Sequence, residues 1–195
     1  MKKNMFCLFF ILLVSDTYAA SNELLNRNIL QVGSADYTQR DLEIYLLTKN
    51  VIVGGQDKLI TKAEWPLLLS MYKDNMLFFT VVNDESQFYG SFQPKLEYMK
   101  ERKKLFYGKL KSYKKISSYI KKQGWTDRNF EEVLVQMEIL KLYLTRKNIV
   151  SEKNFSFKNL ESYLKEPWFK EAVAPKVYRF YEGADKYVKL KGAKF

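Results

Sequence analysis

The segment from residue 61 to about residue 82 constrains the fold most, because its pattern is that of a helix with apolar residues on several sides. Thr61 and Glu64 match a capping box, in which each side chain accepts a hydrogen bond from the other residue's backbone. Pro66 falls in the first turn, where a missing N–H does no harm. Apolar residues then recur every three or four positions and also occupy the other sides. We expect a helix that is buried on several sides or lines a groove.

Other segments repeat this helical pattern, so the chain is expected to be mainly α. Thr38 and Asp41 form a start signal for a helix that ends before Gly54. Residues 95–123 carry apolar side chains at a near-heptad interval and are predicted to form one long helix that ends at Gly124. Two more helices are predicted over residues 127–147, capped by Thr126 or Asp127, and over residues 158–165.

Extended segments are predicted only near the two ends of the chain. Residues 29–33 read as a short strand that ends in a turn. Residues 175–190 read as two strands around a turn at residues 182–185. The polar stretch 83–93 is predicted to be a loop, and no repeat or linker divides the chain. One domain over residues 20–195 is therefore expected.

Residues 1–19 have the layout of a secretory signal peptide. Lys2 and Lys3 precede an apolar run over residues 5–14, and small residues follow from Ala19. The run has ten residues, whereas a membrane-spanning helix needs about 20. We expect cleavage after Ala19 and a periplasmic or secreted protein; the alternatives are a buried N-terminal helix and an uncleaved anchor.

The composition excludes the commonest catalytic groups. The chain has no histidine, and its single cysteine, Cys7, lies within the predicted leader. The commonest general base, metal ligand and thiolate nucleophile are therefore missing. A Ser-x-x-Lys pattern occurs four times, which is the background rate in a lysine-rich chain, and its companion motifs are absent. We expect no enzyme activity, no metal and no cofactor; an enzyme that uses carboxylates or lysine is the least favoured alternative.

Acidic pairs could supply such carboxylates, but they have no supporting context in the sequence. Asp84-Glu85 and Glu131-Glu132 are neighbours in the chain, and neither pair belongs to a recognisable motif. We expect both pairs to lie on the solvated surface.

The chain is strongly basic, with 33 Lys and Arg against 22 Asp and Glu and a formal net charge of +11. For an exported protein this charge favours acidic proteins or anionic lipid over nucleic acid as partners. Residues 95–122 alone carry eleven Lys or Arg against two Glu. A basic face that could attract an anionic membrane surface, or could simply be solvated, is predicted at Lys100, Arg102, Lys103, Lys104, Lys111, Lys114 and Lys115.

The stretch NILQVGSADYTQRDLEIYL resembles the opening of the SurA/parvulin-type periplasmic foldases. The residues that fall on the family pattern are Val32, Gly33, Tyr37, Thr38, Asp41 and Leu42. Gly33-Ser34 departs from the Asn-Gly that the family usually has at this turn. Residues 119–149 resemble the helix–turn–helix of the family, and residues 65–79 its helix between the two matches, so the resemblance spans roughly residues 28–150.

The resemblance implies a SurA N-domain-like helical module with a small β element formed by the N- and C-terminal segments. Residues 29–33 would then pair with a strand from residues 177–190. The isomerase domain of the family has no room in this chain. The implied function is a periplasmic chaperone that binds unfolded or extended polypeptides, for example outer-membrane proteins, without prolyl isomerase activity. The alternative is an assembly protein of an envelope complex that binds one specific partner.

A chaperone groove needs apolar, adaptable surface, which methionine and aromatic side chains provide. Aromatic residues at helical spacing are more often core residues, so part of any such set is expected to be buried. The candidate peptide-binding residues are Trp65, Leu69, Tyr72, Met76, Phe79, Phe106, Leu110 and Tyr113.

Overall fold

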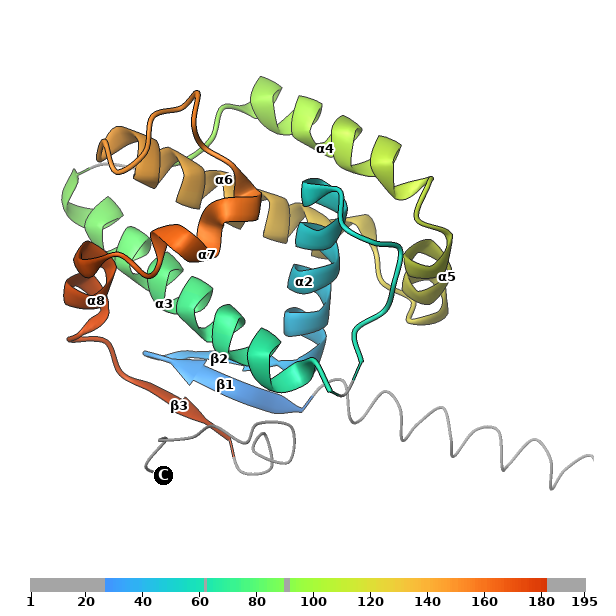
Figure 1. Ribbon diagram of the computed structural model, residues 1–195, viewed down its shortest axis with the longest axis horizontal. Helices are drawn as coiled ribbons and strands as arrows, with labels where there is room; N and C mark the ends of the chain where they lie inside the picture. Colours follow the sequence, from blue (N-terminus) through green and yellow to red (C-terminus); the bar gives the residue numbers. More distant parts are fainter. Residues whose placement is uncertain (1–26, 62, 90–91, 182–195) are drawn as a thin grey trace, which may run out of the picture.

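The computed structural model describes residues 27–61, 63–89 and 92–181 (Figure 1). Within these ranges the chain forms seven α-helices, one short 3-10 helix and a three-stranded antiparallel sheet. The prediction of a mainly helical fold with a small β element is therefore confirmed. The predicted leader and the predicted turn at residues 182–185 lie outside the described residues.

The sheet joins the two ends of the described chain. Strand β1 (Asn28–Val32) lies between β2 (Ala35–Thr38) and β3 (Tyr178–Phe180), and it is antiparallel to both. In the β1–β3 pair, Gln31 is opposite Arg179. The expected pairing of residues 29–33 with a C-terminal strand is thus confirmed, whereas β2 was not predicted. Gly33, at the turn between β1 and β2, has φ 58°, a backbone conformation that glycine adopts without strain.

Helix α2 (Gln39–Val53) begins and ends where the sequence predicts. The backbone N–H of Thr38 donates to Asp41 Oδ2 at 2.8 Å, and the backbone N–H of Asp41 donates to Thr38 Oγ1 at 3.2 Å. Gly54 ends the helix in the left-handed conformation, with φ 73°. These interactions lie within a few residues in sequence, which is why the sequence predicts them.

Helix α3 (Trp65–Tyr89) is longer than predicted, so the prediction of a loop over residues 83–93 is wrong in its first part. The acidic side chains in this part have partners on distant segments. Lys176 forms an ion pair with Asp84, and Tyr143 Oη donates to Glu85 Oε1 at 2.8 Å. This pair is therefore not simply solvated surface, and its interactions hold the last turns of α3 to the rest of the fold.

The predicted helix over residues 95–123 is two helices, α4 (Leu96–Leu110) and α5 (Lys114–Lys122). Tyr113, between them, has φ −93° and ψ 77°, which is not helical. Asp57, in the segment after α2, accepts hydrogen bonds from the backbone N–H groups of Lys115 (3.0 Å) and Ile116 (3.1 Å). The break has a tertiary cause, since a side chain from another part of the chain caps the new helix.

The remaining helices are α6 (Asp127–Arg146), the 3-10 helix η1 (Phe157–Asn159), α7 (Leu160–Tyr163) and α8 (Pro167–Val173). Thr126 is the N-cap of α6 and forms a capping box with Asn129. The helix predicted over residues 158–165 is present as η1 followed by α7, whereas α8 was not predicted.

Helix α6 packs against α2, α3 and α4, and α3 lies along the sheet (Figure 1). The largest fully buried side chains come from several elements: Leu30, Leu42, Tyr45, Leu69, Met76, Phe78, Phe106, Ile116, Leu134, Met137, Leu140 and Leu144. Among the described helices, none combines the length and the apolar character needed to cross a bilayer.

Candidate functional site

The structure places five of the eight predicted peptide-binding residues in the hydrophobic core. Trp65, Leu69, Tyr72, Met76 and Phe106 are between 1% and 8% exposed. A client could not contact side chains that have lost almost all access to solvent. In this conformation they are packing residues, and they do not line the open groove that the sequence suggested.

The other three predicted residues are half-buried and lie in two separate places. Phe79 is on α3, whereas Leu110 and Tyr113 are at the corner between α4 and α5. Tyr113 Oη donates to the backbone carbonyl of Gly55 at 3.0 Å, so this side chain holds the segment after α2. The eight residues therefore do not form one surface.

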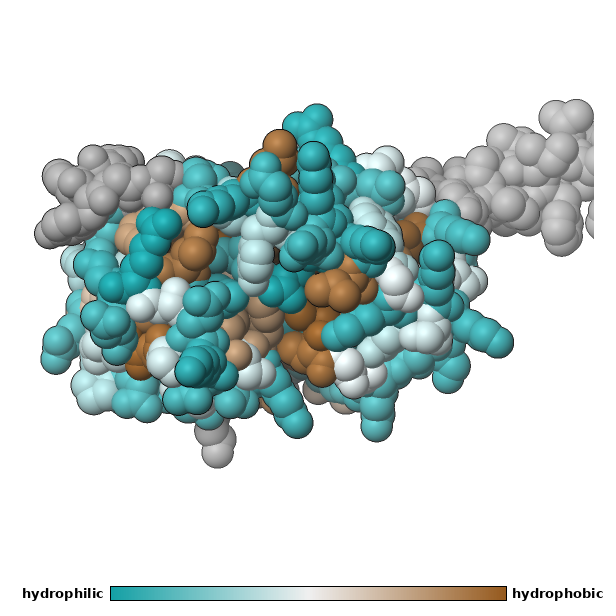
Figure 2. Space-filling view, turned by 90° about the horizontal axis from the view of Figure 1, so that it is seen from above, coloured by the Kyte–Doolittle hydropathy of each residue, from teal (hydrophilic) through white to brown (hydrophobic). Residues whose placement is uncertain are grey.

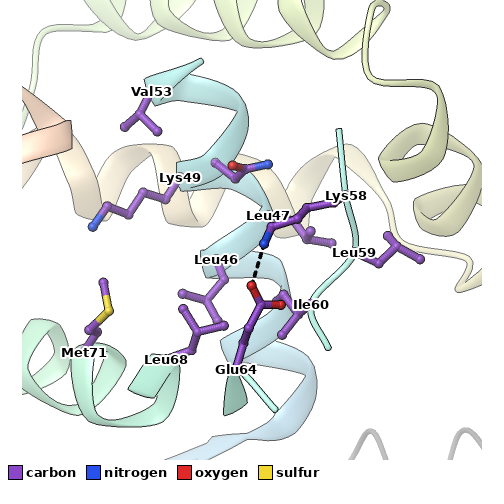
Figure 3. A pocket seen from close by; sticks show the side chains of 11 residues that line it. Leu46, Leu47, Lys49, Val53, Lys58, Leu59, Ile60, Glu64, Leu68 and Met71 are labelled. Atoms are coloured by element: carbon purple, nitrogen blue, oxygen red, sulfur yellow. Dashed lines mark hydrogen bonds and ion pairs between the residues drawn. The ribbon is translucent and has the colours of Figure 1, made fainter. Parts of the chain in front are cut away.

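A pocket lies beside α3. Its lining residues Leu68 and Met71 each precede a predicted peptide-binding residue by one position. It has a volume of about 210 Å³ and is enclosed by α2, the start of α3 and the segment between them (Figure 3). Leu46 and Leu68 point toward one another across it (Figure 3). The apolar side chains that line it are Leu46, Leu47, Val53, Leu59, Ile60, Leu68 and Met71.

Two exposed leucines extend the apolar surface at this pocket. Leu59, which lines the pocket, is 37% exposed. Leu67 is 67% exposed and precedes Met71 by four residues, so both lie on one side of α3. The sequence indicates that α3 has apolar residues on more than its core-facing side. The pattern does not indicate which apolar side the fold leaves open.

An ion pair closes one end of the pocket. Lys58 Nζ lies 2.5 Å from Glu64 Oε1, and the backbone N–H of Thr61 donates to Glu64 Oε2 at 2.9 Å (Figure 3). Hydrogen bonds from the Lys58 side chain and from Thr61 lower the pKa of Glu64 to about 2. Glu64 therefore stays ionised and ties the connecting segment to the start of α3.

Lys49 lies on another wall of the pocket, where it forms an ion pair with Glu161. Burial lowers the pKa of the Lys49 ammonium to about 8, and the ion pair with Glu161 works in the opposite direction. The charged residues around this apolar pocket are therefore paired: Lys49 with Glu161, and Lys58 with Glu64.

The predicted basic face divides into two parts. Arg102 Nε lies 2.6 Å from Glu138 Oε1, and Lys103 Nζ lies 2.7 Å from Glu131 Oε2, so these two cations pair with α6. Within the described part of the chain, the other five residues are exposed and form no ion pair: Lys100, Lys104, Lys111, Lys114 and Lys115.

The two acidic pairs differ in their surroundings. Glu131 pairs with Lys103, as described above, and Glu132 Oε1 lies 3.1 Å from Arg128 Nε, but the Glu132 side chain keeps 60% of its area exposed. The prediction of solvated surface is therefore confirmed for Glu131-Glu132, whereas Glu85 is held by Tyr143.

Of the exposed lysines, Lys114 and Lys115 begin α5, next to the segment that forms the pocket. Asp57 joins this segment to the start of α5, and Lys109 Nζ donates to the backbone carbonyl of Ile52 at 2.7 Å. A partner that reached the pocket would therefore also lie near positive charge at the α4–α5 corner. Figure 2, which views the molecule from above relative to Figure 1, shows several apolar patches among hydrophilic residues.

The pocket can bury apolar side chains of a partner close to the positive charge at the α4–α5 corner. No group of three or more His, Cys, Asp or Glu side chains that could hold a metal occurs within the residues that the structure describes. Comparisons with models of protein families, with curated proteins and with solved structures give no match for this chain.

Proposed function

We propose that this protein binds apolar segments of other polypeptides and acts as a chaperone-like protein without catalytic activity. The observation that carries this proposal is the partly open apolar pocket between α2 and α3, with Leu59 exposed on its wall and Leu67 exposed on the same side of α3 as its lining residue Met71. A relation to the SurA-type modules, supported by the β1–β3 pairing that the resemblance predicted, belongs to the same proposal.

The size of the pocket sets the strength of binding that we expect. Burying one leucine-sized side chain contributes about 1.5–3 kcal/mol. A dissociation constant near 1 mM corresponds to about 4 kcal/mol. One anchored side chain therefore gives binding weaker than about 1 mM, so delaying the aggregation of a client requires apolar contacts beyond the pocket, such as one to the exposed Leu67. The lysines at the α4–α5 corner would increase the rate at which acidic segments associate.

A second candidate is an assembly protein with a single partner. The volume of about 210 Å³ favours it, because this space holds one or two side chains and not a long apolar segment. Co-purification of one partner in a fixed ratio would support this candidate, whereas a mixture of clients would support the chaperone.

The proposal can be tested by measuring light scattering while an unfolded outer-membrane protein aggregates in the presence of the purified protein. We expect suppression at a few-fold molar excess and a clear loss of suppression in Leu67→Ser. Leu96→Ser is the matched control, since Leu96 lies on α4 and is 66% exposed, against 67% for Leu67. Equal activity of the two variants, or no suppression by the wild-type protein, would contradict the proposal.

The proposed site of action is the periplasm, after removal of residues 1–19. Amino-terminal sequencing of the protein from an envelope fraction should give Ala20 as its first residue. Recovery of a chain that still begins at Met1 would contradict this part of the proposal without affecting the binding site.

A further inference from the structure

Helix α5, at one edge of the molecule (Figure 1), presents lysines to solvent on the side away from its buried residues. Ile116 and Ile120 face the core and are 0% and 8% exposed. The lysines form two pairs, 114/121 and 115/122, and residues seven positions apart lie on the same side of a helix. We call these four exposed residues the α5 lysines: Lys114, Lys115, Lys121 and Lys122. The sequence prediction of a basic face included only the first two.

The charge of the α5 lysines is not neutralised along the chain or by ion pairs. Residues 102–126 contain no Asp or Glu. In the described part of the chain, none of the four α5 lysines forms an ion pair. This surface therefore differs from the neighbouring part of α4, where Arg102 and Lys103 pair with carboxylates of α6.

Two carboxylates contact α5, but they leave most of this charge in place. Glu43 Oε2 accepts from Tyr119 Oη at 2.6 Å, and Glu43 is only 6% exposed. Lys115 lowers the pKa of Asp57 mainly through its backbone hydrogen bond and also through its charge. Asp57 therefore offsets part of the charge at the start of α5. Lys122 lies seven residues further on, which is about 10 Å along the helix axis and about one Debye length at physiological salt.

The positions of the first two α5 lysines are not explained by the stability of the helix. Lys121 and Lys122 lie in the last turn of α5, where a cation interacts favourably with the helix dipole. Lys114 and Lys115 lie in the first turn, where a cation is unfavourable for the same reason. An external anion would remove this cost, so the first turn indicates an anionic partner.

We propose that the α5 lysines dock this protein on the surface of a bilayer that contains anionic lipid. Lysine is a hydrated point charge on a flexible stem, so it suits the spread-out phosphates of a lipid surface and requires no fixed geometry. Ser118 lies between the two pairs and is exposed, so this side of α5 carries no apolar side chain to insert. The choice of lipid over nucleic acid rests on the proposed export of the chain.

The docking would place the apolar pocket beside the membrane. Asp57 joins the start of α5 to the segment that encloses the pocket, so the two surfaces are held together. The lipid contact does not depend on what the pocket binds. Failure of vesicle binding would therefore leave the proposed binding of apolar polypeptide segments intact, and the reverse also holds.

The test is co-sedimentation of the purified protein with vesicles of phosphatidylcholine mixed with phosphatidylglycerol, and with vesicles of phosphatidylcholine alone. We expect binding to the anionic vesicles only. Raising the salt concentration from about 0.1 M to about 1 M shortens the Debye length from about 10 Å to about 3 Å and should release the protein. Equal binding to both kinds of vesicle would mean apolar insertion and would contradict the proposal.

Three variants make the test specific to α5. Lys121→Gln/Lys122→Gln should lower the partition coefficient on anionic vesicles roughly 25-fold, since each lysine near such a surface contributes about fivefold. Lys114→Gln should lower it about fivefold without lowering the melting temperature, because it removes an unfavourable cation from the first turn. The control, Lys165→Gln/Lys170→Gln, removes the same net charge at exposed positions after α7 and on α8 and should bind like the wild-type protein.

The proposal is overturned if the protein does not bind anionic vesicles. It is also overturned if the α5 pair and the control pair lower binding equally, because net charge alone would then account for it. Duplex DNA is added as a competitor at the same salt concentration. Release of the protein at a DNA phosphate concentration equal to or below that of the lipid would make nucleic acid the partner and overturn the proposal as well.

Discussion

Asp57 Oδ1 accepts a hydrogen bond from the backbone N–H of Ile116 at 3.1 Å, across 59 residues of sequence. Its other oxygen, Oδ2, accepts from the backbone N–H of Lys115 at 3.0 Å. The hydrogen bond from Lys115 is the largest cause of the lowered pKa of Asp57; desolvation opposes it, and the hydrogen bond from Ile116 lowers the pKa further. One side chain therefore starts α5 and fixes the segment that forms the apolar pocket.

Replacing Asp57 by alanine should lower the free energy of unfolding, because α5 loses the side chain that caps its first N–H groups. Asp57→Asn should cost less, because the amide oxygen still accepts a hydrogen bond. Urea unfolding at neutral pH measures both changes. Glu171→Ala, an exposed position on α8, is the control and should stay within about 0.5 kcal/mol of the wild-type protein. An unchanged free energy of unfolding in Asp57→Ala would mean that this cap does not stabilise the protein.

Removing Arg102 alone is expected to destabilise the protein more than replacing Arg102 and Glu138 together, because a buried charge without a partner is costly. Glu138 is 1% exposed, and burial raises the pKa of its carboxyl while Arg102 lowers it. Arg102→Leu should cost about 3–5 kcal/mol, because it leaves a buried carboxylate without this partner. The double variant Arg102→Leu/Glu138→Leu should recover most of that loss.

A double-mutant cycle by urea unfolding measures this coupling. The loss in Arg102→Leu should shrink as the pH falls, because protonation neutralises the isolated carboxyl. Strictly additive effects of the two single variants would contradict the interpretation.

Glu64 should make the protein sensitive to acid. Its pKa in the folded state is about 2, below the ordinary value of 4.5, so its stabilising contribution is complete above pH 4.5. That contribution is lost as the pH falls from about 5 toward 2, since the unfolded chain takes up the proton first. Because this ion pair is exposed, we expect no more than about 1 kcal/mol.

The measurement compares the wild-type protein with Glu64→Gln in urea at pH 7 and near pH 2. The wild-type protein should be more stable at pH 7, and the difference should approach zero at the lower pH. A difference that is equal at both pH values would show that the charge of Glu64 does not contribute.

Phe78 is expected to be among the most sensitive positions of the core. Its ring centroid lies 5.4 Å from that of Tyr143, 5.7 Å from that of Trp168 and 6.1 Å from that of Phe169, so it joins α3 to α6 and α8. Phe78→Ala should cost about 3–5 kcal/mol through lost burial and the cavity left behind. Thermal and urea unfolding measure this change, with Phe78→Leu as the milder comparison. A loss below about 1 kcal/mol would contradict the proposed role of this cluster.

The starts of α2 and α6 illustrate what can be read from the sequence. Thr38 is paired with Asp41, and Thr126 with Asn129, in capping boxes that the structure contains. At α6 the sequence left Thr126 and Asp127 as alternatives, and the hydrogen bonds of the structure identify Thr126. Such signals succeed because both partners lie within three residues of each other.

The pairing of β1 with β3 was expected from a family resemblance, whereas β2 and α8 were missed. Both missed elements are short, with four and seven residues, and carry too few residues for a periodic pattern. Their positions depend on neighbours that are distant in sequence, such as Phe78 for α8.

The sequence by itself determined the helical character of this protein, the starts of its main helices and the lack of histidine and of any cysteine beyond Cys7. Only the tertiary structure decided where α4 gives way to α5, through Asp57, and which side of α3 stays open. Leu69 and Tyr72 are buried there, whereas Leu68 and Met71 line the pocket. A helix that is apolar on several sides has no single preferred face, so the elements that pack against it determine which side chains reach solvent.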